Sequence, residues 1–293
     1  MPAATALVLQ RAMTTMASAS TPSGSSLTKH FYDHEGWKEQ DGTLRDSALF
    51  GAKEVGPIRD AAYIQRMSRL LDHVRSAGTY LNLLECGCGG NPELAFSSLL
   101  RHYTGVDFSR TGIEAARAVM EESGVPYTLL EGDICRLPFK DSEFDAVYSA
   151  HVIYHIPDPD AQAAAFSEAM RVTRAGGVGV FVLANPRPLL FPARLATRVF
   201  ADLAPVRRVL DAVRRKPPLP YKPMPLGWMR DCLAPFGDVS IEVYALASTW
   251  FNQKVSEHGI GALAWRAIER LERDFHTSAA ELGNYVQIIV RRR

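Results

Sequence analysis

The sequence predicts an α/β fold: a seven-stranded, mostly parallel β-sheet with helices on both faces, a helical N-terminal cap and helical insertions. Short apolar runs alternate with segments of helical periodicity between residues 80 and 185. This alternation is typical of parallel strands joined by crossover helices. A glycine-rich turn follows the first apolar run, and acidic residues stand at the ends of the first three. With 293 residues, 47% of them apolar, the chain can form one sizeable domain with additions or two modest ones.

The expected elements follow in order along the chain. Residues 30–78 are expected to be largely helical, with Gly78 as the stop; one apolar face would hold Ile58, Ala62, Ile64, Met67, Leu70, Leu71 and Val74. The seven strands are expected at 80–86, 103–108, 127–132, 144–150, 178–184, 239–247 and 285–290. Helices fit at 92–101, 110–122 and about 158–173, and a further helical insertion fits at 251–283.

These elements suggest five regions. They are a tail or targeting segment (1–28), a helical N-terminal cap (29–79), a ligand-binding core (80–185), a basic helical insertion (186–235) and the last strands of the core with a helical insertion (236–293). Residues 1–28 contain no acidic residue and are rich in Ser and Thr. Two interpretations stay open: a disordered tail, or a transit peptide for an organelle.

Composition and charge exclude several classes of function. Lys and Arg number 33 against 32 Asp and Glu, a net charge of +1, which argues against a global polyanion-binding surface, and we expect no DNA partner. Four cysteines suit a reducing compartment, so we expect a cytoplasmic protein. Cys86 and Cys88 lack the second ligand pair of a zinc site, and we expect no metal. No apolar run approaches the roughly 18 residues of a membrane-spanning helix.

Three successive strand ends carry residues suited to one ligand. The first ends in Glu85 and a turn containing Gly87 and Gly89, which lets the backbone approach a ligand closely. The second ends in Asp107, a carboxylate able to accept two hydrogen bonds from a ribose diol; the third is followed by Asp133 and Ile134, suited to the amine and the ring of adenine. The carboxyl ends of parallel strands form the usual ligand crevice of such a sheet. A nicotinamide dinucleotide is disfavoured, because proline stands at position 92, where its G-x-G-x-x-G motif needs glycine.

The motifs resemble those of the class I S-adenosylmethionine-dependent methyltransferases, over about residues 80–185. LLECGCGGNP is similar to the family's glycine motif, although Asn91 replaces its last glycine. TGVDFS resembles the ribose-binding strand end, and residues 131–159 resemble the segment shared by quinone-biosynthesis and other small-molecule methyltransferases. RAGGVGVFV resembles the turn into the fifth strand. The resemblance implies a Rossmann-like fold and S-adenosyl-L-methionine as cofactor, with little information on the substrate.

The resemblance also implies roles for individual residues. Gly87 and Gly89 would border the methionine moiety, with Glu85 near its ammonium group. Asp107 would hold the ribose, Phe108 would lie against the adenine, and Asp133 and Ile134 would hold the adenine. His151 would lie beside the sulfonium and the acceptor, and Tyr32 or Trp37 in the N-terminal cap would cover the cofactor.

The catalytic candidates are His151, Tyr154 and His155. A hydroxyl acceptor must lose a proton, and histidine is the natural base near pH 7. His155 can instead serve only to order its loop, and a sulfur, nitrogen or activated carbon acceptor needs no base at all. The acceptor atom therefore stays open among O, N, S and C.

The basic insertion and the cap would select the acceptor. Residues 186–230 hold ten basic residues against Asp202 and Asp211, a pattern that fits a solvated lid, a lipophilic or acidic small-molecule acceptor, or peripheral contact with an anionic membrane. Two alternatives remain: a methyltransferase for RNA or protein, and a non-catalytic S-adenosylmethionine-binding protein of the same fold. RNA is disfavoured because SAHVIYH, and not an Asn/Asp-Pro-Pro motif, follows the fourth strand. The sequence does not give the oligomeric state.

Overall fold

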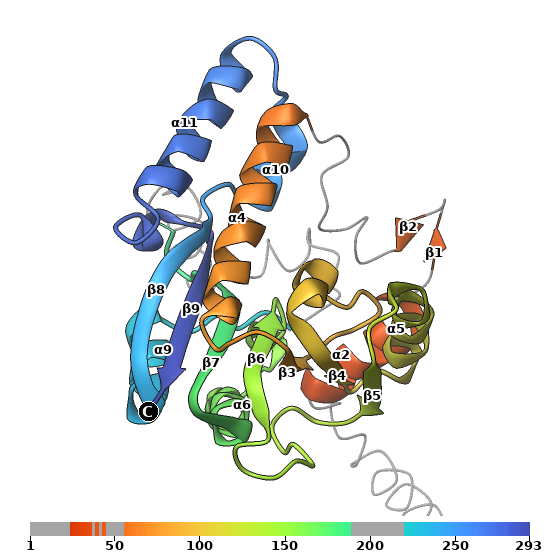
Figure 1. Ribbon diagram of the computed structural model, residues 1–293. Coiled ribbons are helices and arrows are strands. Elements are labelled where there is room, and N and C mark those ends of the chain that lie inside the picture. Colours follow the sequence, from red (N-terminus) through yellow and green to blue (C-terminus); the bar gives the residue numbers. More distant parts are fainter. Residues whose placement is uncertain (1–23, 37–38, 41–42, 45–55, 189–219) are drawn as a thin grey trace, which may run out of the picture.

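A computed structural model describes residues 24–36, 39–40, 43–44, 56–188 and 220–293. Its centre is a seven-stranded sheet of strand order β5-β4-β3-β6-β7-β9-β8 (Figure 1). β9 runs antiparallel to both of its neighbours, and the other paired strands are parallel. The predicted α/β class is therefore confirmed. The strands are β3 (Leu81–Cys86), β4 (Leu100–Asp107), β5 (Tyr127–Glu131), β6 (Phe144–Ala150), β7 (Thr173–Ala184), β8 (Gly237–Ala245) and β9 (Tyr285–Arg292).

Helices cover both faces of the sheet, as expected. One face packs against α4 (Pro57–Arg75), α5 (Arg110–Ser123) and the short η2 (Leu94–Leu99). The other packs against α6 (Pro159–Val172), α9 (Leu226–Leu233) and η3 (Ile153–His155). The remaining short turns are η1 (Tyr32–Gly36), η4 (Ala234–Phe236) and η5 (Ala280–Leu282).

Local sequence signals set several of these boundaries. The Ser109 hydroxyl caps α5 by accepting the Gly112 amide at 3.1 Å, and Gly124 ends the helix in the left-handed conformation. Asp158 caps α6, with proline in the first helical position. Both helices therefore begin and end close to their predicted positions.

Two predicted helical regions are wrong in part. The stretch 92–101 holds the 3-10 turn η2 and not an α-helix, because pairing of β4 with β3 already begins at Leu100. Residues 30–78 are interrupted by two short antiparallel strands, β1 (Glu39–Gln40) and β2 (Thr43–Leu44). The Asp-Gly dipeptide between them in the sequence favours such a hairpin. Ile64 is 58% exposed, so it does not share the buried face of α4.

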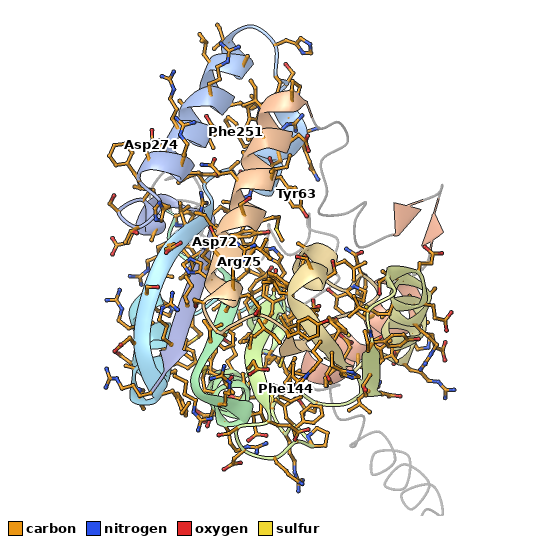
Figure 2. The ribbon with its side chains drawn as sticks, in the orientation of Figure 1. Tyr63, Asp72, Arg75, Phe144, Phe251 and Asp274 are labelled. Carbon is orange, nitrogen blue, oxygen red and sulfur yellow. The ribbon has the colours of Figure 1, made fainter. Side chains whose placement is uncertain are left out.

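The C-terminal helices form a separate layer with the N-terminal half of α4. α10 (Thr249–Lys254) and α11 (Ile260–Asp274) lie beside α4, beyond the edge of the sheet (Figure 1). Phe251 of α10 packs on Trp265 of α11, with ring centroids 4.9 Å apart (Figure 2). The Glu257 carboxylate accepts the amides of Gly56, Ile58 and Arg59 at the start of α4. These contacts fix the position of α4 over one end of the cavity described below.

The N-terminal helix α2 (Gly24–Phe31) is bound to the opposite edge of the sheet. Lys29 Nζ donates to the Phe108 carbonyl and to Glu131 Oε1, the latter at 3.1 Å. The carboxylate of Asp33, in η1, accepts the Arg110 amide at 3.0 Å. Among the described helices, none is both long enough and apolar enough to span a bilayer.

Candidate functional site

The loop after β3 depends on two glycines. Gly87 has φ +79° and Gly89 has φ +52°, a backbone region that other residues rarely adopt. A Cβ atom on Gly87 would overlap the side chain of Val152. The Gly87 amide donates to the Val106 carbonyl at 2.7 Å, and the Gly89 amide donates to Asp107 Oδ2 at 2.9 Å. The loop therefore folds back over the end of β4 and fixes Asp107.

Asp107 lines a cavity, and its carboxylate is held at both oxygens. Oδ1 accepts the Ser109 amide at 2.8 Å, and Oδ2 accepts the Gly89 amide. Burial raises the pKa of Asp107 to about 6, although the two amides act in the opposite direction. A carboxylate has about four acceptor sites. Two therefore remain for hydroxyl donors such as those of a ribose.

Residues that suit adenine lie at the same end of the cavity. Asp133 and Ile134 follow β5, and both line the cavity. Asp133 Oδ1 accepts the Cys135 amide at 2.9 Å, which orients the carboxylate. Phe108 and Tyr32 add aromatic rings whose centroids lie 6.4 Å apart. A flat heterocycle with an exocyclic amine fits this combination of apolar faces and one carboxylate.

Glu85 and Gly89 are not among the described residues that line the cavity. The Glu85 side chain is buried, and Oε2 accepts the Tyr103 hydroxyl at 2.7 Å and the Glu93 amide at 3.0 Å. Burial raises the pKa of Glu85 to about 8, so this carboxyl is mostly protonated at pH 7. A role for Glu85 beside a ligand ammonium group stays a prediction. What the structure shows is a carboxyl group that ties β3 to β4 and to the glycine loop.

His151 lies at the other end of the cavity, directly after β6. Its amide donates to the Val182 carbonyl at 2.9 Å, which extends the pairing of β6 with β7. Its φ is +62°, a strain of about 1–3 kcal/mol of the kind that collects at functional sites. The side chain is exposed into the cavity, and desolvation by the surrounding protein lowers the pKa of His151 to about 4. His151 is therefore neutral at pH 7 and able to accept a proton.

Tyr154 and His155 have different surroundings. The Tyr154 hydroxyl lies 3.1 Å from His151 Nδ1, so it can orient that ring. His155 Nδ1 lies 2.7 Å from the Pro220 carbonyl, which can only accept a hydrogen bond, so this nitrogen carries the proton. Burial lowers the pKa of His155. His155 thus holds in place the segment that begins at residue 220. Ordering a loop is one of the two roles that the sequence left open for His155.

Sequence reasoning missed several residues of this end. Tyr244 of β8 and Tyr285 of β9 line the cavity, with ring centroids 5.8 Å and 4.9 Å from that of His151. Arg66 of α4 and Asn252 of α10 line it as well. Since β9 is antiparallel, its first residue lies at the edge where the parallel strands end. The direction of β9 could therefore have pointed to Tyr285. No comparable feature of the sequence pointed to Arg66.

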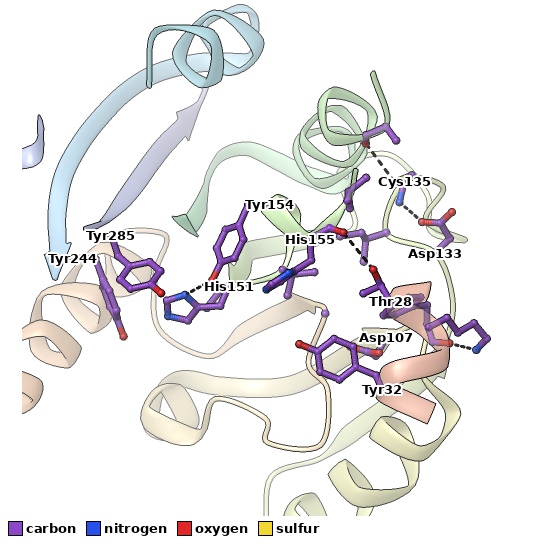
Figure 3. Close-up of a pocket in the computed structure, with 18 of the residues that line it drawn as sticks. Thr28, Tyr32, Asp107, Asp133, Cys135, His151, Tyr154, His155, Tyr244 and Tyr285 are labelled. Atoms are coloured by element: carbon purple, nitrogen blue, oxygen red, sulfur yellow. Dashed lines mark hydrogen bonds between the residues drawn. The ribbon is translucent and has the colours of Figure 1, made fainter. Parts of the chain in front are cut away.

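The two ends belong to one cavity of about 780 Å³ (Figure 3). Asp107, Asp133, Thr28 and Tyr32 lie at one end, and His151, Tyr244 and Tyr285 at the other. Known ligand pockets measure roughly 300–1,000 Å³, so this volume suits a nucleotide-sized ligand together with a second small molecule. Trp37 and most of the basic insertion lie outside the described residues, as do nearly all of residues 1–28.

The core of the chain is similar in sequence to known methyltransferases. Residues 84–181 match the family described as "Methyltransferase domain". The sterol 24-C-methyltransferase ERG6B of Gibberella zeae is 28% identical over 172 residues, which cover 55% of this chain and 42% of that protein. The fatty-acid O-methyltransferase of Mycolicibacterium smegmatis is 31% identical over 137 residues, covering 45% of this chain and 48% of that protein. The chain thus spans about half the length of the curated relatives it matches.

A solved structure shows the same fold. The N-methyltransferase NodS from Bradyrhizobium japonicum WM9, in complex with S-adenosyl-L-homocysteine, superposes with a TM-score of 0.52 at 15% identity, covering 90% of this chain and 98% of that one. At this identity the likeness concerns the fold. Residues 84–181 thus match a methyltransferase domain, and the chain shares the fold of this N-methyltransferase, with the glycine loop, Asp107 and Asp133 at three strand ends of that fold.

Proposed function

We propose that this protein is an S-adenosylmethionine-dependent methyltransferase that acts on a hydroxyl oxygen of a small, largely apolar molecule. One observation carries the proposal. A single cavity joins the ribose-binding carboxylate of Asp107 to the neutral imidazole of His151. The cofactor end and the acceptor end of one transfer reaction are thereby connected.

The residues of the cofactor end fit S-adenosylmethionine. S-adenosylmethionine, when bound, supplies a methyl group on a sulfonium. Asp107 would accept hydrogen bonds from the ribose, and Asp133 would accept from the adenine amine beside Ile134. Gly87 keeps the backbone free of side chain where the ligand passes, and its left-handed conformation excludes most replacements.

His151 would act as general base. Its Nδ1 lies against the Tyr154 hydroxyl, which leaves Nε2 as the nitrogen open to a hydroxyl acceptor when Tyr154 accepts the Nδ1 proton. A positioned base contributes about 10²- to 10⁴-fold to such a reaction. Orientation of the acceptor in line with the transferred methyl group contributes further. The aromatic wall of Tyr154, Tyr244 and Tyr285 supplies that orientation and keeps water away from the reacting atoms.

The relatives support a lipophilic acceptor. The two relatives are named as methyltransferases of a sterol and of a fatty acid. The acceptor end described here is rich in aromatic and aliphatic side chains, which is consistent with a similar class of molecule for this chain.

Calorimetric titration with S-adenosylhomocysteine, S-adenosylmethionine and NADH tests the cofactor. We expect micromolar binding of both sulfur nucleotides and no binding of NADH. Methyl transfer to hydroxylated acceptors is then followed by mass spectrometry. Folded protein that binds neither sulfur nucleotide would contradict the proposal, as would transfer that occurs equally well without His151.

A further inference from the structure

The charges of the cavity are segregated between its two ends. The cofactor end carries the carboxylates of Asp107 and Asp133, and Lys29, the cation among its described residues, is already paired with Asp33 and Glu131. Among the described residues of the acceptor end, Arg66 is the charged side chain. An acceptor that enters this aromatic end therefore meets a guanidinium whose partner, Glu272, lies on its other side from Nη2.

The guanidinium of Arg66 is only partly used by the protein. Nη1 donates to Glu272 Oε2 at 3.0 Å. Nε is buried and has no hydrogen-bond partner within the described part of the chain. Nη2 has no hydrogen bond there either, and it is not among the fully buried atoms. The side chain keeps 19% exposure.

The unused atoms form one edge of the guanidinium. Of these two atoms only Nη2 can meet a ligand in the cavity, because Nε is enclosed by protein. A ligand oxygen that accepts from Nη2 would give the guanidinium a partner that the protein does not supply, and such a charge-assisted hydrogen bond is stronger with a carboxylate than with a neutral oxygen. Arg69, one turn further along α4, adds positive charge, since its three side-chain nitrogens are buried without partners.

The carboxylates near Arg66 are already engaged within the protein. Glu272 accepts from Arg66 and from the Leu246 amide. Glu242 is bound to His73 and to Gln287. A singly charged carboxylate at Arg66 would bring less charge into this apolar enclosure than a doubly charged phosphate.

The position of Arg66 relative to the proposed base defines a substrate shape. Its guanidinium carbon lies 5.7 Å from the Tyr244 ring centroid, and the same ring lies 5.8 Å from His151. The guanidinium and the imidazole therefore both lie near the Tyr244 ring. A molecule that spans the two would place its body against Tyr244 and Tyr285.

We infer that the acceptor is a hydroxy acid: its carboxylate accepts a hydrogen bond from Nη2 of Arg66, its body packs on the aromatic wall, and its hydroxyl is presented to His151. This inference rests on the proposed function and names the substrate class of that site. Arg66 is then an acceptor-binding residue that leaves cofactor binding unchanged.

The test uses para-hydroxyphenyl alkanoates with one, two or three methylene groups, each paired with its carboxamide. The full-length protein, saturated with S-adenosylhomocysteine, is titrated calorimetrically with each compound. For the best-fitting length we expect the acid to bind roughly tenfold or more tightly than its amide, because a hydrogen bond to a charged group is stronger than one to a neutral group. Arg66→Gln should bring this ratio close to one. Arg66→Lys should give an intermediate ratio, because lysine keeps the positive charge but lacks the planar guanidinium group.

Arg75→Gln is the matched control. It makes the same change on the same helix, but Arg75 is half-exposed beside Asp72 (Figure 2) and is not among the residues that line the cavity. It should keep the wild-type ratio. Affinity for S-adenosylhomocysteine should stay within about threefold in all variants, and thermal unfolding shows whether Arg66→Gln is folded; Arg66→Lys replaces it if it is not.

Equal binding of acids and amides at every chain length would overturn the inference, as would an acid preference that survives in the Arg66 variants. Octanoate is included as a further probe. If the enzyme converts it to a methyl ester, the carboxylate binds at the methyl group of the cofactor and not at Arg66, and the inference is overturned. Failure of S-adenosylhomocysteine to bind would contradict the proposed function instead. The acid–amide comparison is then made on the protein without nucleotide and still decides the inference.

Discussion

The two ends of the cavity are built in different ways. At the cofactor end, the functional groups stand on consecutive strand ends, and backbone amides hold them: Asp107 by Gly89 and Ser109, and Asp133 by Cys135. At the acceptor end, side chains come from distant parts of the chain, with Arg66 on α4, His151 after β6, Tyr244 on β8 and Tyr285 on β9. The sheet carries His151, Tyr244 and Tyr285, and ring contacts between their side chains bring them together.

The difference follows from what each end has to recognise. A nucleotide offers fixed hydroxyl and amine groups, which backbone-locked carboxylates on a rigid sheet can match. An acceptor varies between enzymes, and side chains on added helices and late strands can vary without disturbing the sheet. Substitutions at the two ends should therefore affect different measurements.

The largest effect is expected at His151. His151→Asn should lower the single-turnover methyl transfer rate by about 10²- to 10⁴-fold, because the proposed base is removed. Asparagine is chosen because it tolerates the left-handed backbone at this position. Quenched-flow assays with the best hydroxyphenyl alkanoate measure the rate, and calorimetry should show S-adenosylhomocysteine affinity within about threefold of wild type. A rate close to wild type would remove His151 from the chemistry.

The second-largest effect, a loss of affinity for the nucleotide, is expected at Asp107. Asp107→Ala should weaken S-adenosylhomocysteine binding by about a hundredfold or more, since two hydrogen bonds to a charged acceptor are lost. Asp72→Ala, an exposed carboxylate on α4, serves as the control for a change of charge. Calorimetry measures the affinity of both variants. Unchanged affinity in Asp107→Ala would show that the nucleotide does not bind at Asp107.

The pH dependence should also differ between the two ends. The pKa of Asp107 is raised to about 6, so below pH 6 a bound proton must leave before the ribose can be held. Affinity for S-adenosylhomocysteine should fall as pH falls from 7 to 5, by up to about tenfold per unit. The pKa of His151 is lowered to about 4, so the single-turnover rate should stay flat over the same range. Asp107→Asn should flatten the affinity profile; an affinity that does not change in the wild type would contradict the assignment.

The smallest effect on binding is expected at Glu85. Its carboxyl group faces Tyr103 and Glu93 and not the cavity, so Glu85→Gln should change S-adenosylhomocysteine affinity by less than about threefold. The pKa of Glu85 is raised to about 8. The stability that this raised pKa provides is fully present below pH 4.5 and is lost as pH rises through 8. Urea unfolding at pH 6 and pH 9 should therefore show the wild type losing more stability than the variant. A hundredfold loss of affinity would instead place Glu85 at the ligand.

Much of the cofactor end could be predicted from the sequence. Gly87, Asp107 and Asp133 follow apolar runs, and parallel strands bring their carboxyl ends to one edge whatever the helices do. The 3-10 turn η2 was predicted as an α-helix because apolar spacing does not show how early β4 begins to pair. The hairpin of β1 and β2 was missed because the clear apolar periodicity of residues 58–78 was extended to the whole stretch from residue 30.

The sequence by itself therefore determined the sheet, the glycine loop and the carboxylates of the cofactor end, because each depends on local patterns and on strand order. Only the tertiary structure decided the acceptor end. Arg66 and Tyr244 are separated by well over a hundred residues, and their meeting depends on how α4 packs against the sheet and against α11. The tertiary structure also decided that Glu85 faces inward and that the pKa of His151 is lowered, because the surroundings of both side chains depend on contacts from the whole fold and leave no pattern in the chain.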